Sequence, residues 1–364
     1  MATLNQFDLE KAILIAIKSD NIPFISGSPG IGKSAIIQSI ARKLNYKLID
    51  LRLTQLQPYD LAGLITPYKN DKDEIKATYS PLEYFPLENE ELPDGKQGFL
   101  LFLDEFNSAD KYTLAAAYKL LLDRKIGENK LHPSVRIVCA GNLMTDNAIA
   151  HNLPTPIVSR ITHLHLKNPG KEWIDWVIEQ NNWSDSIISF LSYQPQYISN
   201  FDALMENDTD FTTFACPRTW KMLSDQLNNG LLDSFNLKKG TDKTVLRTII
   251  DGIIGEQASN DFISFLKYAD EIPTTQQIVS NPQDAKIPSK EGAYWALMGQ
   301  LVSCFREYRN ESDKINNLIM YINRIENNDI KVLTYKRVKK IFPELDNFPL
   351  FREEALKIIK YMNE

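Results

Sequence analysis

The stretch from Gly27 to Ser34 has the residue types and the spacing that bind a nucleotide phosphate. It reads Gly-Ser-Pro-Gly-Ile-Gly-Lys-Ser and fits the Walker A pattern G-x-x-x-x-G-K-[ST]. Its glycines let successive backbone N–H groups point at one phosphate, and the helix that follows adds its positive dipole end. Lys33 would reach the β- and γ-phosphates, and the Ser34 hydroxyl would bind Mg²⁺. The residues predicted to contact the nucleotide here are Gly27, Ser28, Pro29, Gly30, Ile31, Gly32, Lys33, Ser34 and Ala35.

The segments on either side of this loop fit the same interpretation. Ile22–Ser26 is typical of a short buried strand, and Ser34–Ile40 is typical of the first turns of a helix. The pattern requires a strand, a glycine loop and a helix start in this order. This context favours a phosphate loop over a chance glycine-rich turn.

Two adjacent acids, Asp104 and Glu105, follow the apolar run Gly98–Leu103. Such a continuous run predicts a strand that is buried on both faces. The acids would then lie at the carboxyl edge of a parallel sheet, where ligands bind. Asp104 fits a Walker B acid that holds Mg²⁺, and Glu105 is placed to polarise the attacking water. An Asp-Glu pair can also simply end a strand, but the upstream Walker A pattern favours the functional interpretation.

Asn142 and Arg160 stand next to two further predicted strands, Arg136–Ala140 and Ile161–Leu166. At the same sheet edge, Asn142 would orient water or sense the γ-phosphate, although Gly-Asn also starts many turns. Arg160 could neutralise charge on the transferred phosphoryl group, whereas the usual role of an arginine is a surface ion pair. We predict catalytic roles for Lys33, Glu105, Asn142 and Arg160, and metal binding by Ser34 and Asp104.

Arg218 lies in a later stretch, Cys216–Trp220, where Pro217 suits the first turn of a helix. From there Arg218 could reach the nucleotide and report domain closure. The alternative is an ordinary solvated helix arginine.

Strands that alternate with helices predict an α/β fold with a parallel sheet covered by helices on both faces. Asn168-Pro169-Gly170 breaks this pattern, and the chain beyond it reads as helices. We therefore expect a nucleotide-binding domain at residues 1–168, a helical lid at 169–270 and a helical C-terminal region at 271–364, which begins with the polar linker Glu271–Lys290. Further expected elements are the helices Phe7–Lys18 and Ala109–Asp123 and the strand Tyr46–Leu51. Thr66–Gly95 is long for a plain connection, so it is either a functional insertion or a mobile loop.

The order Walker A, Walker B with Glu105, Asn142, Arg160 and Arg218 resembles an AAA+ ATPase with two sensor residues and an arginine finger. The resemblance narrows to the MoxR branch of the dynein-related subfamily, and it covers about residues 10 to 230. The strings that carry it are Gln55–Gly63 (like that branch's helix-2 insert), Leu153–Pro156 and Pro217–Trp220. The chain departs from the family in having Ile161, where phenylalanine usually follows the finger arginine.

The resemblance implies ATP and Mg²⁺ as ligands and a hexameric ring in which Arg160 acts on the neighbouring subunit's ATP. It also implies chaperone-like remodelling of a protein client, often together with a von Willebrand A-domain partner. Beyond about Asn229 we find no resemblance, so client and partner do not carry over.

The composition of the chain narrows the classes of protein to which it could belong. At 364 residues the chain has room for about two domains, and its net charge of −6 implies no general attraction to nucleic acid. Three widely spaced cysteines suit a reducing cytosol, and no apolar run approaches a membrane span. The first residues lack the pattern of a signal peptide, so we expect a cytoplasmic protein.

Several alternatives to a protein-remodelling ATPase stay open. Asp60–Gly63 fits the D-x-x-G of GTPases, but no Asn-Lys-x-Asp string reads guanine, and no Ser-Gly-Gly-rich ABC signature precedes the acids. A nucleic-acid motor or loader remains, since AAA+ rings include many of them. The basic cluster Lys336, Arg337, Lys339 and Lys340 could contact a phosphate backbone, although such a run is more often a solvated helix face. The third alternative is a switch that binds ATP for assembly without hydrolysing it.

Overall fold

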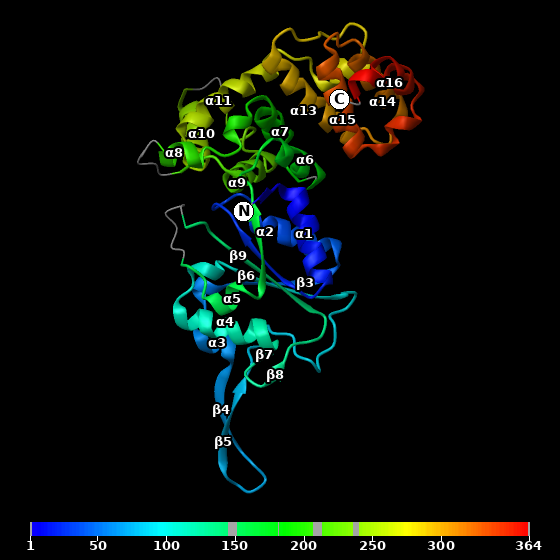
Figure 1. Ribbon diagram of the computed structural model, residues 1–364. Coiled ribbons are helices and arrows are strands. Elements are labelled where there is room, and N and C mark those ends of the chain that lie inside the picture. Colours follow the sequence, from blue (N-terminus) through cyan, green and yellow to red (C-terminus); the bar gives the residue numbers. More distant parts are fainter. Residues whose placement is uncertain (1, 145–150, 181, 207–212, 236–239, 363–364) are drawn as a thin grey trace. The chain divides into compact units, whose positions relative to one another are not determined.

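The computed structural model describes residues 2–144, 151–180, 182–206, 213–235 and 240–362 (Figure 1). It divides the chain into two compact units, Met1–Asn168 and Pro169–Glu364. No helix among these described residues has the length and apolar character needed to cross a bilayer.

The first unit is an α/β unit whose helices alternate with strands. Its strands are β1 (Thr3–Leu4), β2 (Ile22–Ser26), β3 (Tyr46–Arg52), β4 (Leu64–Lys69), β5 (Ile75–Ser80), β6 (Gly98–Asp104), β7 (Lys125–Ile126), β8 (Asn129–Lys130), β9 (Val135–Gly141) and β10 (Ile161–Leu166). Its helices are α1 (Gln6–Lys18), α2 (Lys33–Lys43), α3 (Pro58–Ala62), α4 (Lys111–Asp123) and α5 (Thr155–Val158). The α/β prediction is therefore confirmed, and the five strands expected from the sequence are all present.

The central sheet has the strand order β1-β10-β2-β9-β6-β3, and every neighbouring pair in it is parallel. In this register Cys139 of β9 lies opposite both Phe24 of β2 and Leu103 of β6. The edge strand β1 was not expected, because two residues are too few to show a strand pattern. All these strands end at one edge, so the segments that follow them meet there.

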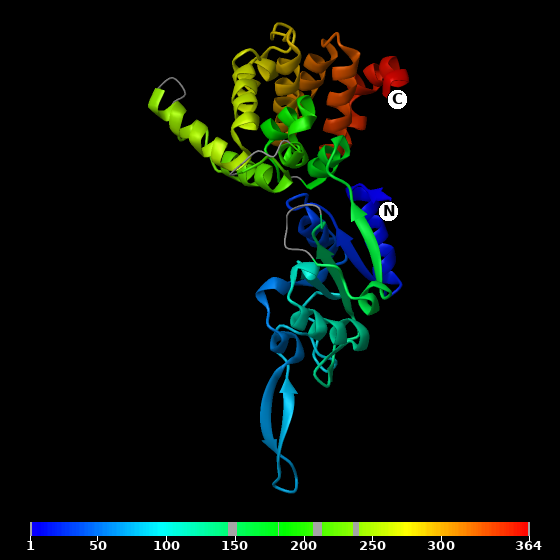
Figure 2. The same ribbon diagram turned by 60° about the vertical axis from the view of Figure 1, so that its left-hand side comes forward.

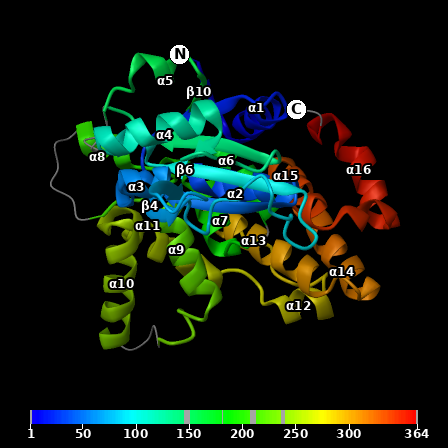
Figure 3. The ribbon, with the colours of Figure 1, turned by 90° about the horizontal axis from the view of Figure 1, so that it is seen from below.

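Helices cover both faces of this sheet, which explains why its central strands are apolar throughout. On one face, Leu101 and Ile137 pack in a buried cluster with Leu114 and Leu120 of α4. On the other, α1 and α2 pack on each other; α1 lies against β2 and β10, and α2 lies against β3 and β6. Figure 3 shows α4 and α2 on opposite sides of the sheet.

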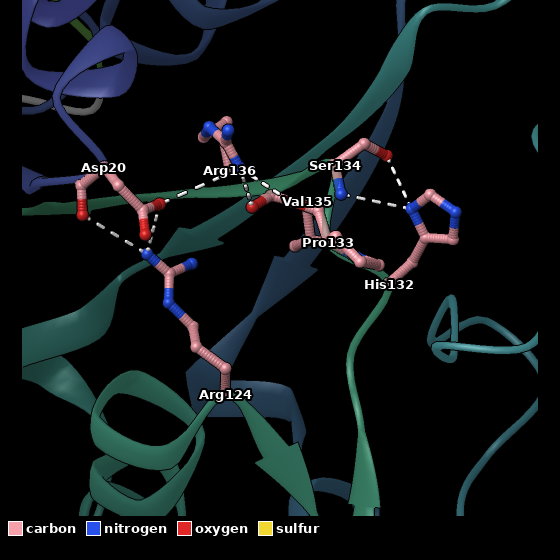
Figure 4. Close-up of polar contacts among 7 residues, drawn as sticks. All are labelled: Asp20, Arg124, His132, Pro133, Ser134, Val135 and Arg136. Atoms are coloured by element: carbon pink, nitrogen blue, oxygen red, sulfur yellow. Dashed lines mark hydrogen bonds and ion pairs between the residues drawn. The ribbon is translucent and has the colours of Figure 1, made fainter.

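An ion cluster joins three segments at the sheet edge opposite the phosphate loop (Figure 4). Asp20, in the turn after α1, accepts a hydrogen bond from Arg124 Nη2 at 3.0 Å and lies 3.7 Å from Arg136 Nη1. Asp20 and Arg124 both have left-handed backbones, with φ of 55° and 54°. Partial burial lowers the pKa of Arg124, and the charge of Asp20 opposes that shift. The carboxylate therefore offsets two guanidinium groups that the fold places at the ends of α4 and β9.

Replacing Asp20 with alanine should destabilise this unit by only about 1 kcal/mol, since the aspartate is exposed and its ion pairs are screened by solvent. The expected readout is a thermal midpoint lower by about 2–4 °C. Asp20→Asn is the matched control for charge, because asparagine tolerates the left-handed backbone and keeps one hydrogen bond. An unchanged midpoint for Asp20→Ala would show that the cluster adds nothing to stability.

The segment expected as an insertion or mobile loop contains an antiparallel hairpin. Its strands β4 and β5 pair from Leu64–Ser80 to Lys69–Ile75, and Figure 2 shows the hairpin extending away from the central sheet. Apolar side chains such as Ile65 and Ile75 are exposed on it. Asn129 Nδ2 donates to the Tyr79 carbonyl at 3.2 Å, which anchors the base of the hairpin to the β7–β8 turn.

The second unit consists of helices in the part of it that the structure describes, as predicted. They are α6 (Lys171–Gln180), α7 (Asp185–Tyr193), α8 (Phe201–Glu206), α9 (Pro217–Asn228), α10 (Gly240–Ile254), α11 (Glu256–Leu266), α12 (Thr275–Ser280), α13 (Glu291–Glu307), α14 (Ser312–Asn323), α15 (Asn328–Ile341) and α16 (Pro349–Met362). The expected linker Glu271–Lys290 contains α12, which a Thr274 capping box starts and whose Ile278 is fully buried. Helix α13 then packs on both α7 and α15.

Candidate nucleotide-binding site

The phosphate loop connects β2 to α2, as its pattern predicts. Gly30 and Gly32 have φ of 78° and 102°, in the left-handed region that favours glycine. Within the described part of the chain, no side chain caps the start of α2 at Gly32. The first N–H groups of α2 therefore face the loop with their dipole, an arrangement that suits an anionic ligand.

Lys33 lies inside this loop with a side chain that is nearly buried. Its Nζ donates to the carbonyl oxygens of Gly27 at 2.6 Å and Ser28 at 3.0 Å, and to Asn142 Oδ1 at 3.0 Å. A buried ammonium requires such oxygen partners. The structure therefore brings together the lysine of the Walker A motif and the asparagine predicted as a sensor, which are 109 positions apart.

Ser34 and Asp104 meet where α2 begins and β6 ends. Ser34 Oγ donates to Asp104 Oδ2 at 3.0 Å, and the other oxygen of Asp104 accepts from the Glu105 N–H at 2.9 Å. The pKa of nearby Asp50 is raised by partial burial and, next, by the charge of Asp104. A hydroxyl and a carboxylate in a negative environment are the oxygen donors that Mg²⁺ prefers, so these residues fit that ion.

Glu105 follows directly in a left-handed backbone conformation, with φ of 54°. For a residue other than glycine this conformation costs about 1 kcal/mol or more and often marks a functional site. Its carboxylate accepts a hydrogen bond from the Thr54 hydroxyl. Thr54 was not predicted, although one signal was available: it follows β3, the strand that pairs with β6.

Asn142 follows β9, and its backbone is bonded to the side chain of Asn107, a second residue that the sequence did not single out. Asn107 lies in the turn immediately after Glu105. Lys33, Ser34, Asp104 and Asn142 thus form one continuous set of contacts, with Asn107 behind them.

Arg160 lies apart from this set and is exposed. Its guanidinium donates to the Pro156 carbonyl at 2.7 Å and lies 5.8 Å from the centre of the Tyr118 ring. Within the described residues, none of its contacts is with the phosphate loop of its own chain. The following Ile161 is buried in the apolar core of the sheet.

Arg218 belongs to the second unit, where it is exposed in the first turn of α9. Pro217 occupies the first position of that helix, as expected, and Trp220 is fully buried beside it. The role of Arg218 at the nucleotide stays a prediction.

The chemistry available at this site is phosphate and Mg²⁺ binding, together with a carboxylate that could activate water. Residues 23–160 match the sequence model of a family described as "AAA domain (dynein-related subfamily)". Midasin of Giardia intestinalis is 25% identical over 177 residues, which are 46% of this chain and 3% of that protein. The catalytic subunit of poly(A) polymerase from Swinepox virus is 27% identical over 119 residues, which are 33% of this chain and 24% of that protein. The chain thus spans less than half of the length of either relative.

Two solved structures complete the comparison. The RuvB Holliday junction branch migration motor of Thermotoga maritima has a TM-score of 0.35 and 15% identity, and the match covers 77% of this chain and 76% of that one. NtrX of Brucella abortus has a TM-score of 0.38 and 14% identity over 93% of this chain and 68% of that one. By its sequence match and its phosphate-loop geometry, the stretch at residues 23–160 is similar to AAA domains of the dynein-related subfamily.

Proposed function

We propose that this chain binds ATP together with Mg²⁺ and hydrolyses the ATP to ADP and phosphate. The observation that supports this most is the contact set of Lys33, Ser34, Asp104 and Asn142 at one sheet edge. This set provides an ammonium group that can bind phosphate, a hydroxyl and a carboxylate that can bind a metal ion, and an amide that can hydrogen-bond to water or to phosphate. Glu105 directly follows Asp104 and adds a second carboxylate.

In this proposal the backbone N–H groups from Gly30 to Ser34 hold the phosphates together with Lys33. Ser34 and Asp104 would hold Mg²⁺, which neutralises charge on the phosphate oxygens when it is bound. Glu105 takes a proton from the attacking water, and Asn142 orients that water. Because the Thr54 hydroxyl already bonds to the Glu105 carboxylate, it also limits where that carboxylate can point.

We propose further that Arg160 acts on the ATP of a neighbouring copy in a homo-oligomeric ring, which is hexameric in the MoxR family. Its exposure and its contacts with Pro156 and Tyr118 support a role outside its own phosphate site. The same two residues line an apolar groove of about 700 Å³, and uncovered apolar surface of this kind favours protein contact. Arg218 would report nucleotide binding from the helical unit.

The work driven by hydrolysis is then a MoxR-like, chaperone-like remodelling of a protein client, with a von Willebrand A-domain protein as a possible partner. The nucleic-acid alternative gains little support. In the basic run Lys336–Lys340, Lys339 pairs with Asp346 at 2.9 Å and Lys340 pairs with Asp175 at 2.7 Å. Arg337 is buried, and its burial lowers its pKa to about 10. Most of the cationic groups of this run are thus used within the unit.

The direct test is to measure phosphate release and ATP binding by the purified chain with Mg²⁺. Lys33→Ala is expected to weaken ATP binding by about 10- to 100-fold, because it removes a charged hydrogen-bond donor to phosphate. Lys72→Ala, at an exposed lysine in the hairpin turn, is the matched control and should bind ATP normally. Absence of Mg²⁺-dependent ATP binding by the unmodified chain would overturn the proposal.

A further inference from the structure

Asn107 is a buried polar residue directly behind the candidate site. It lies in the short 3-10 turn Phe106–Ser108 and is only 6% exposed. The turn follows the two acids, so Asn107 is two positions from Glu105. A buried amide is tolerated where its donor and acceptor groups are both satisfied.

The amide of Asn107 pairs with both backbone groups of one residue, Asn142. Asn107 Nδ2 donates to the Asn142 carbonyl at 2.9 Å, and Asn107 Oδ1 accepts from the Asn142 N–H at 3.1 Å. Two bonds to one residue hold its backbone in position and orientation. Because the backbone of Asn142 is held in place, the base of its side chain is held as well. That side chain accepts a hydrogen bond from Lys33 Nζ through its Oδ1 atom.

The packing around this pair leaves no room for a side chain at position 141. A Cβ atom added at Gly141 would lie 2.1 Å from Asn107 Oδ1 and 2.9 Å from Cζ of Phe24. Only glycine therefore permits Asn107 to reach the backbone of Asn142 at this point. The contact depends on the residue types at positions 107 and 141, because at position 142 it uses only backbone groups.

The backbone of Asn107 reaches a third functional segment. Its carbonyl oxygen accepts a hydrogen bond from the His151 N–H at 2.7 Å. The segment that begins at His151 continues through α5 to Arg160. One residue thus contacts the backbone of the candidate sensor and the segment that carries the candidate finger, and it is two positions from the candidate base.

We propose that Asn107 is a positioning residue that couples Asn142 to Glu105 and to the segment carrying Arg160. A displacement of Asn142 that follows the γ-phosphate is passed through the paired amide to the turn after Glu105, and through the Asn107 carbonyl to His151. The inference rests on the proposed ATP hydrolysis and adds a route by which the state of the phosphate reaches the surface of the unit.

A double-mutant cycle separates this role from simple support of the fold. Asn107→Ala should lower kcat by about 10- to 100-fold, as small misplacements of catalytic groups do, while the Kd for ATP stays within about threefold. If Asn107 acts through Asn142, the double variant Asn107→Ala/Asn142→Ala should be no slower than Asn142→Ala alone. The cycle with Arg160→Ala should be non-additive in the same way.

Two further variants serve as controls. Ser108→Ala lies in the same turn, and the Ser108 hydroxyl has no hydrogen-bond partner among the described residues, so kcat should not change. Asn107→Asp keeps the acceptor but loses the donor to Asn142. Its deficit in kcat should shrink as the pH falls, because a protonated carboxyl can donate again.

The results distinguish the two proposals from each other. Multiplicative losses in both cycles, or equal losses of ATP affinity and kcat in Asn107→Ala, would overturn the coupling role while hydrolysis by the unmodified chain stands. No hydrolysis by the unmodified chain would overturn the proposed function and the coupling role together.

Discussion

Arg160→Ala is expected to reduce ATP hydrolysis by about 10³- to 10⁵-fold, the range that an arginine finger contributes to phosphoryl transfer. ATP binding by the same variant should be retained, because Arg160 makes no contact with its own phosphate loop among the described residues. The physical reason is that a guanidinium supplied by a second copy neutralises charge that develops only in the transition state. Turnover should therefore also rise steeply with protein concentration in the unmodified chain.

Mixing two inactive variants tests whether Arg160 acts between copies. Lys33→Ala subunits keep Arg160, and Arg160→Ala subunits keep the phosphate loop, so mixed assemblies contain some complete sites. Phosphate release by the mixture should exceed that of either variant alone. Arg352→Ala, at an exposed arginine of α16, should behave as the unmodified chain does. Lost ATP binding in Arg160→Ala, or a mixture as inactive as its parts, would show that Arg160 is a structural residue.

Glu105→Gln should lower kcat by about 10²- to 10⁴-fold, the usual contribution of a general base. Glutamine has nearly the same shape and can still accept from Thr54, but its amide cannot take a proton from water. ATP affinity should change little, since the contacts of Lys33, Ser34 and Asp104 do not involve the Glu105 carboxylate. The variant should therefore hold ATP in an assembled state.

Three measurements check this expectation: single-turnover hydrolysis, ATP binding, and size by light scattering in the presence of ATP. Glu128→Gln, at a largely exposed glutamate in the β7–β8 turn, is the matched control and should hydrolyse ATP normally. Hydrolysis by Glu105→Gln at the normal rate would refute the role of Glu105 as base. If the trapped assembly forms, capturing partners with it identifies the client directly.

Much of the first unit could be predicted from the sequence because its signals are local. Strand Ile22–Ser26, the glycine loop and the start of α2 are consecutive, and each has a residue pattern of its own. The helix predicted from Ala109 begins two residues later, at Lys111, because Asp110 caps it by accepting hydrogen bonds from the N–H groups of Tyr112 and Thr113. Such boundaries depend on one side-chain bond rather than on periodicity.

The sequence did not single out Thr54 and Asn107, because their contacts join positions that are far apart in the chain. Thr54 and Glu105 are 51 positions apart, and Asn107 and Asn142 are 35 apart. Threonine and asparagine are common near strand ends and turns, so their presence at these positions does not by itself indicate a functional residue. The strand order, which places β3 beside β6 and β6 beside β9, is what makes these pairs neighbours. Similarly, the short helix α12 was not predicted because most of its residues are polar.

The contacts of Lys33 with oxygen atoms of its own chain have a consequence for the end of each cycle of the proposed ATP hydrolysis. The chain itself supplies these oxygens, from Gly27, Ser28 and Asn142. A nearly buried ammonium without such partners would carry a large desolvation penalty and would resist the departure of any anion bound to it. If the chain hydrolyses ATP as we propose, the carbonyl oxygens of the loop can accept hydrogen bonds from Lys33 once ADP leaves, so this arrangement favours rapid nucleotide exchange over long retention.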